Sequence, residues 1–122
     1  MEGAQGGLRE RTKTFALRVI RLVAALPREP RCDVLGKQLL RCATSVGANY
    51  RAACRARSPS EFRAKLGIVE EEADESSYWI ELLVESGMMK PESVQGLLDE
   101  ANELVAMIVA SIRTSRKNHP RK

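Results

Sequence analysis

Hydrophobic residues recur along this chain every three or four positions, in four segments that proline-containing breaks separate. The first three segments span about 8–26, 31–57 and 58–87, and the fourth begins at 91 and ends near Ser111 or Arg116. This spacing keeps the apolar side chains of each segment on one face of a helix. No segment alternates with the period of two that a half-buried strand requires. Four helices joined by short connections predict an all-α fold, an antiparallel up-down four-helix bundle.

Residues at the segment ends support these bounds. Pro27 ends the first helix, because proline clashes with the preceding turn and lacks an amide hydrogen. Ser58 or Ser60 can cap the start of the third helix, and Gly87 suits the cap at its end. The sequence therefore predicts a flexible N-terminus at 1–7, a bundle at 8–112 and a basic C-terminal tail at 113–122.

The second segment carries two neighbouring stripes at helical spacing instead of one. The first stripe consists of Leu35, Leu39, Cys42, Val46, Asn49 and Ala53. A helix with two such stripes can pack against two sets of neighbours. The second stripe contains small residues, which would let another helix approach closely, and we expect it to contact a second copy of the chain in a homo-oligomer. This small-residue stripe consists of Gly36, Leu40, Ala43, Gly47, Tyr50 and Cys54.

Charge is strongly segregated, although the whole chain carries a net charge of only +4. Residues 1–60 carry a net charge of +8, residues 61–112 carry −9 and residues 113–122 carry +5. Such segregation favours pairing between the halves or between subunits, and it leaves basic surface free elsewhere.

Four of the cations lie within a narrow arc of the second helix, away from its main apolar stripe. They can form a solvated face, pair with acids of the third helix, or contact phosphates, which the planar guanidinium of arginine suits. No exposed aromatic residues alternate with these cations, so we expect any nucleic-acid binding to follow the backbone, with strong salt dependence and weak sequence preference. The candidate nucleic-acid contacts are Lys37, Arg41, Arg51, Arg55, Arg57, Arg113, Arg116 and Lys117.

The residues of common catalytic and metal sites are missing. His119 is the single histidine, and the sequence has no phosphate loop, dinucleotide fingerprint, nucleophile elbow or zinc-ligand spacing. The acidic run 70–75 lacks the paired histidines of di-iron bundles. We therefore expect no enzymatic activity, no cofactor and no metal.

The chain also lacks the hallmarks of export. Its three cysteines are odd in number, which favours reduced thiols, and no run approaches the roughly 18 apolar residues of a membrane span. The first seven residues contain no apolar run of a signal peptide. We expect a cytoplasmic protein without a membrane partner.

One long segment, QLLRCATSVGANYRAACRARSPSEF, and the acidic stretch after it form a pattern that can be compared with known families. Further residues of the pattern are Phe15, Ala16, Leu26, Pro27, Glu81, Leu82 and Leu83. Within the long segment they are Gln38, Leu39, Arg41, Ser45, Val46, Ala48, Asn49, Ser58 and Phe62. On these residues the chain, from Phe15 to Ile112, resembles the 23S rRNA intervening-sequence proteins, a bacterial family of four-helix bundles. Many members read Asn-Ile-Ala-Glu-Gly where this chain has Asn49-Tyr50-Arg51-Ala52-Ala53.

The resemblance implies a small non-enzymatic bundle. Several members form ring-shaped homopentamers, and a related group, the accessory variability proteins of diversity-generating retroelements, binds nucleic acid and a reverse transcriptase. The resemblance thus implies a pentamer with RNA, DNA or a protein as its partner. A purely structural or protein-binding oligomer, with its basic surface used between subunits, is the alternative.

Overall fold

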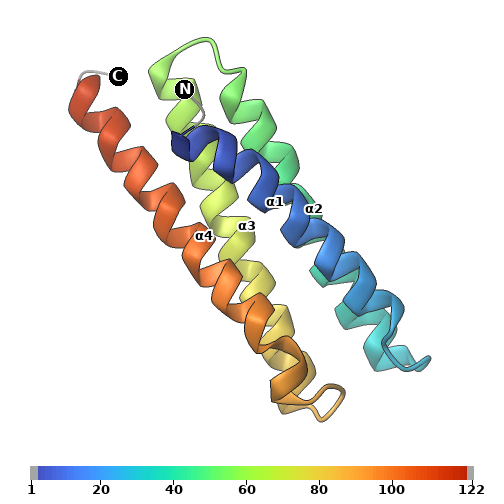
Figure 1. Cartoon of the computed structure of the whole chain (residues 1–122). Helices are drawn as coiled ribbons and strands as arrows, with labels where there is room; N and C mark the ends of the chain where they lie inside the picture. Colours follow the sequence, from blue (N-terminus) through green and yellow to red (C-terminus); the bar gives the residue numbers. More distant parts are fainter. Residues whose placement is uncertain (1–2, 121–122) are drawn as a thin grey trace.

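Four long helices make up almost the whole molecule. The computed structural model describes residues 3–120, with side chains from Gly7 onward. The helices are α1 (Gly3–Ala24), α2 (Pro30–Cys54), α3 (Pro59–Glu85) and α4 (Pro91–Asn118). They run alternately up and down and lie side by side (Figure 1). The prediction of an all-α, up-down four-helix bundle is confirmed.

Short-range interactions fix the start of α3 and its end. Ser58 Oγ accepts a hydrogen bond from the amide of Glu61 at 3.0 Å, so Ser58 is the N-cap. Pro59 then occupies the first helical position, where a missing amide hydrogen has no cost. After the helix, Gly87 has φ +84°, a left-handed conformation that glycine adopts without strain.

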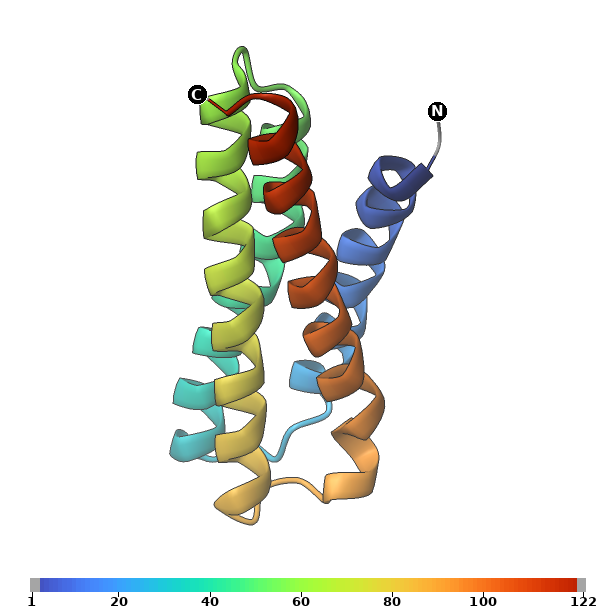
Figure 2. The same ribbon diagram turned by 90° about the vertical axis from the view of Figure 1, so that its left-hand side faces the viewer.

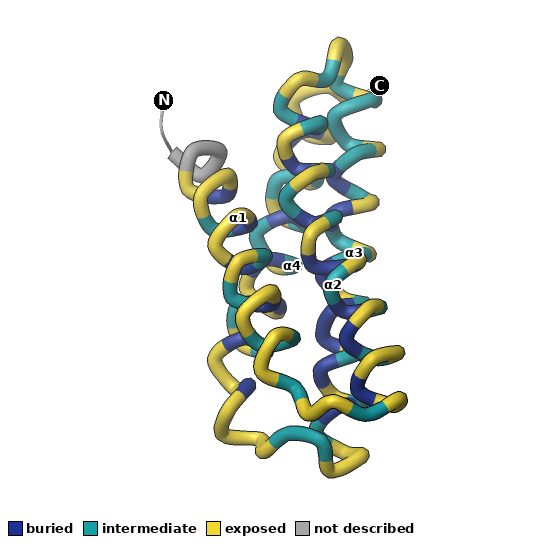
Figure 3. Tube along the Cα trace, turned by 90° about the vertical axis from the view of Figure 1, so that its right-hand side faces the viewer, coloured by how far each residue is buried: buried dark blue, intermediate teal, exposed yellow. Residues whose placement is uncertain are grey.

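The predicted apolar faces form the interior. Buried positions recur along the inner sides of the helices (Figure 3). Phe15 is fully buried, and burial of such a side chain contributes about 1.5–3 kcal/mol. On α4 the buried face is centred on Leu97 and Leu104 more than on Leu98 and Val105, which are half-buried. The largest fully buried side chains are Leu8, Phe15, Leu39, Leu66, Ile80, Leu83, Leu104 and Ile108.

Both ends of the bundle differ from the sequence-based division. Helix α1 begins at Gly3, so residues 3–7, predicted as a flexible segment, are helical. Helix α4 continues to Asn118, six residues into the predicted tail and close to the later of the two ends that the spacing allowed. Arg63 Nη1 donates to Ser115 Oγ at 3.0 Å and ties the last turns of α4 to α3. Residues 121 and 122 of the tail lie outside the described residues.

Helix α1 packs mainly on α2, and its N-terminal part diverges from α4 (Figure 2). Arg11 nevertheless connects α1 to α4, with its Nη2 2.7 Å from both Glu100 Oε1 and Glu103 Oε1. These hydrogen bonds raise the pKa of Arg11 above its ordinary value. Within residues 3–120, no helix has the length and hydrophobicity needed to cross a bilayer.

Candidate nucleic-acid interface

The up-down order of the helices brings three basic segments to one end of the bundle. Helix α2 ends there, α3 begins there and α4 ends there (Figure 1). The described residues 50–65 and 108–120 contain a single acid, Glu61. We call the six exposed cations of these segments the basic end, namely Arg51, Arg55, Arg57, Arg113, Arg116 and Lys117.

The cations of the basic end are available to an external anion. Arg57 Nε lies 3.8 Å from Glu61 Oε1, but the Arg57 side chain is 91% exposed. Such a pair contributes little, because water screens it. No acid within residues 7–120 pairs with the other five cations. Arginines in this state can hold phosphate oxygens through two parallel hydrogen bonds.

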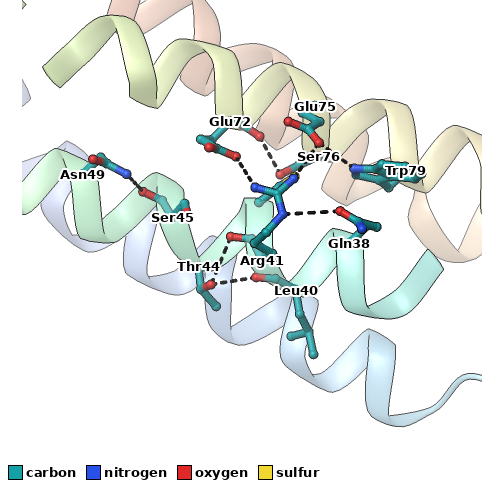
Figure 4. Close-up of polar contacts among 11 residues, drawn as sticks. Gln38, Leu40, Arg41, Thr44, Ser45, Asn49, Glu72, Glu75, Ser76 and Trp79 are labelled. Atoms are coloured by element: carbon teal, nitrogen blue, oxygen red, sulfur yellow. Dashed lines mark hydrogen bonds and ion pairs between the residues drawn. The ribbon is translucent and has the colours of Figure 1, made fainter. Parts of the chain in front are cut away.

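Arg41 has a different environment, in the middle of the α2–α3 contact (Figure 4). Its Nη2 lies 2.7 Å from Glu75 Oε2, and its Nη1 lies 3.5 Å from Glu72 Oε1. Its Nε also donates to Gln38 Oε1 at 3.3 Å. The pairing with acids of α3, one of the alternatives that the sequence left open, therefore occurs at Arg41 in the structure.

Lys37 is also separate from the basic end. It precedes Arg51 by 14 positions of the same helix, which corresponds to about 21 Å along the axis. The structure thus joins six of the eight predicted nucleic-acid contacts and separates Lys37 and Arg41 from them. Nothing local in the sequence distinguishes Arg41 from Arg51, because the partners of Arg41 come from a helix more than 30 residues away.

A thiol lies within the Arg41 network. Cys42 Sγ is 3.1 Å from Arg41 Nη2, and Trp79 Nε1 donates to Glu75 Oε2 at 3.1 Å. Burial, with a hydrogen bond to Glu75, raises the pKa of Cys42 to about 12. The hydrogen bond from Trp79, followed by contributions from Cys42 and Arg41, lowers the pKa of Glu75.

The same network has three potential metal ligands. The ligand atoms of Cys42, Glu72 and Glu75 lie within 4.8 Å of one another. However, the Arg41 guanidinium contacts both carboxylates, and the raised pKa of Cys42 keeps the thiol protonated. A metal would have to displace this cation and a proton, so the group is better described as an ion-pair network.

The small-residue stripe of α2 packs against α1 of the same chain. A Cβ atom added to Gly36 would lie 3.1 Å from Val23 Cγ1, and one added to Gly47 would lie 3.5 Å from the Thr12 carbonyl oxygen. Gly36, Ala43 and Tyr50 are buried, and Leu40, Gly47 and Cys54 are half-buried. The close helix approach predicted for this stripe thus occurs within the chain. A second copy would reach its buried members only if α1 moved away.

A cavity of about 790 Å³ opens at the basic end, between the end of α2, the start of α3 and the last turns of α4. Phe62, Met107 and Ala110 contribute apolar walls, and Thr114 and Asn118 contribute polar ones. Sequence reasoning missed this cavity. Its lining comes from two segments about 50 residues apart and forms no motif, so no local signal indicates it.

Comparison with known proteins agrees with the fold. A family model for "23S rRNA-intervening sequence protein" matches residues 8–110. A crystal structure of a protein of unknown function from the S23 ribosomal protein family of Bacteroides thetaiotaomicron superposes with a TM-score of 0.84. The two chains are 32% identical over 89% of this chain and 97% of the other. No curated protein sequence matches this chain.

Proposed function

The chain belongs to the 23S rRNA-intervening sequence protein family, and we propose that it is a non-catalytic, oligomeric bundle that binds the RNA or DNA backbone. The basic end forms the contact surface in this proposal. The three free cysteines fit a reducing compartment, and we place the protein in the cytoplasm.

The observation that carries this proposal is the convergence of exposed cations at one end of the bundle. Arg51, Arg55 and Arg57 lie at the end of α2 and in the connection after it, while Arg113, Arg116 and Lys117 come from the last turns of α4. A concentration of one sign of charge attracts a polyanion and releases its counterions on binding. Because phosphates look alike in every sequence, this surface favours affinity over sequence preference.

Exposed apolar side chains support self-association. Leu17 and Ile20 lie one turn apart on α1 and are 42% and 44% exposed, and Val34 on α2 is 61% exposed. Exposed apolar residues of this size offer contact area to a second copy. A pentamer, as the family resemblance implies, stays a prediction that light scattering tests.

The salt dependence of binding tests the proposed surface. Affinity for a duplex RNA should fall at least tenfold between roughly 50 and 200 mM salt, since several phosphate contacts release counterions. Replacing Arg113, Arg116 and Lys117 with alanine should lower affinity about tenfold at low salt and flatten the slope. The matched control replaces Arg21, Arg28 and Lys90, three exposed cations outside the basic end, and loses the same charge.

Two results would contradict the proposal: affinity that does not change with salt, or an equal loss of affinity in both triple variants.

In the alternative function, a purely structural or protein-binding oligomer, the cations act between subunits. Charge reversal by Arg51→Glu and Arg55→Glu would then dissociate the oligomer without affecting RNA binding. Elemental analysis of the purified protein tests for an unexpected metal and thus for an enzymatic role.

A further inference from the structure

The cavity at the basic end combines two kinds of wall. Phe62 on α3 and Met107 and Ala110 on α4 line it with apolar surface. Ser111, Thr114 and Asn118, at successive turns of α4, line it with hydroxyl and amide groups. An acyl chain needs uniformly apolar walls, because polar groups left without partners are costly. A heteroaromatic ring, with apolar faces and hydrogen-bonding edges, fits the mixed lining better.

One cation of the basic end belongs to this cavity. Arg57 is one of the lining residues, and its side chain is 91% exposed. The cations of α4 do not line the cavity, because the lining residues of α4 lie on another face of that helix. A ligand that placed a ring in the cavity would therefore have its attached anionic group within reach of the Arg57 guanidinium.

We propose that this cavity binds a nucleotide, with the base inside and the phosphate on Arg57. The inference rests on the proposed nucleic-acid function and adds a base-binding site to it. A volume of about 790 Å³ lies within the usual range for small-molecule sites, which is about 300–1,000 Å³. Only an unpaired base can enter, so the site prefers single strands or free nucleotides over duplexes.

This site changes the expected mode of binding. The sequence predicted contacts to the backbone alone, because no exposed aromatic residues alternate with the cations. Phe62 is half-buried and lies far along the chain from the α4 lining residues, and the fold brings them together around the cavity. A base held against Phe62 and Met107 would gain stacking energy that a duplex cannot gain.

The test fills the cavity without changing charge. Ala110→Trp and Thr114→Trp each place an indole at an exposed lining position. The matched control is Ala106→Trp, an exposed position one turn earlier on the same helix that does not line the cavity. Circular dichroism checks that all three variants fold. Binding of a single-stranded RNA oligonucleotide, a duplex RNA of equal length and adenosine monophosphate is measured for each.

We expect both cavity variants to bind single-stranded RNA at least fivefold more weakly than the wild type, because one stacked base is lost. Their affinity for duplex RNA should stay within twofold of the wild type. The control should match the wild type for all ligands. If wild-type adenosine monophosphate binding is measurable and the cavity variants lose it, a free nucleotide suffices as ligand. If only the oligonucleotide binds, the ligand is a base within a strand.

Other outcomes separate this inference from the proposed function. Salt-dependent binding of both RNAs that the cavity variants leave unchanged would overturn the base site and retain the basic end. The absence of any RNA or nucleotide binding would overturn both the base site and the proposed function.

A second test needs no mutation and uses Cys54, which lines the cavity. Saturating single-stranded RNA should slow its alkylation at least threefold, and an unchanged rate would contradict occupancy.

Discussion

Arg41 and Arg51 lie on the same helix, ten residues apart, and have opposite environments. Arg41 lies against Glu72 and Glu75 of α3, in contact also with Gln38 and Cys42. Arg51 is exposed, and no acid of the described chain pairs with it. The difference comes from the facing helix, since α3 presents acids beside Arg41 while the segments around Arg51 contain only Glu61.

The comparison teaches that a basic stripe on a helix is not one surface. Where the neighbouring helix supplies carboxylates, an arginine forms ion pairs across the helix contact. Where the neighbouring segments are basic, the same residue type remains available to an external anion. The contrast between the Arg41 network and the basic end can be tested by chemical reactivity, binding, stability and pH dependence.

The largest expected difference concerns two cysteines of α2. Cys42 is fully buried in the Arg41 network with a pKa raised to about 12 from 9.0, whereas Cys54 is half-buried beside the cavity. Because the thiolate is the reactive form, iodoacetamide at pH 8 should modify Cys54 at least about a hundredfold faster than Cys42. Peptide mass spectrometry over time measures both rates in one sample. Buried Cys32 is the internal control and should also react slowly. Equal rates would mean that the α2–α3 contact opens readily.

The next largest effect concerns RNA binding. The double variant Arg51→Ala and Arg55→Ala should lower affinity for duplex RNA about tenfold at low salt, because two phosphate contacts are lost. The slope of log affinity against log salt should become shallower by about 0.7–0.9 for each lost contact. Arg41→Ala should stay within about twofold of the wild type. Fluorescence anisotropy titrations at several salt concentrations measure all three proteins, and a loss as large in Arg41→Ala would invalidate the distinction.

The free energy of unfolding should show the reverse order, with a larger loss in Arg41→Ala than in Arg51→Ala. Arg41→Ala should lower the free energy of unfolding by about 0.5–1 kcal/mol, a modest value because the Arg41 side chain is 49% exposed. Arg51→Ala should change it by less than about 0.5 kcal/mol. Urea denaturation followed by circular dichroism gives both values. Arg41→Lys is the conservative comparison and should recover only part of the loss, since one ammonium group replaces a fork that contacts two carboxylates.

The smallest expected effect is a change with pH in the stability that the Arg41 network contributes through Glu75. The pKa of Glu75 is lowered from 4.5, so its carboxylate stabilises the fold above that pH. This contribution is lost as the pH falls through the lowered pKa and Glu75 is protonated in the folded state. The stability advantage of the wild type over Glu75→Gln should therefore shrink as the pH falls from about 6 to about 3. An advantage that grew on acidification would have the wrong sign for a lowered pKa.

The sequence by itself determined the helices and the interior. Stripes of apolar residues at spacings of three and four, broken by prolines, fixed four helices in number and approximate extent, because helical periodicity is a local property. The cap at Ser58 and the turn at Gly87 were also predictable, since each depends on residues within one turn. The hydrogen bond from Arg63 that ties Ser115 of α4 to α3 was not, because the two residues are more than 50 positions apart.

Only the tertiary structure decided what those helices present. It packed Gly36 and Gly47 against α1, paired Arg41 with acids of α3, and brought Arg57 and Phe62 together with the last turns of α4 around one cavity. Each of these outcomes depends on the order of the helices and on the rotation of each about its own axis. Side chains distant along the chain meet through these two quantities, and no spacing within a single helix encodes them.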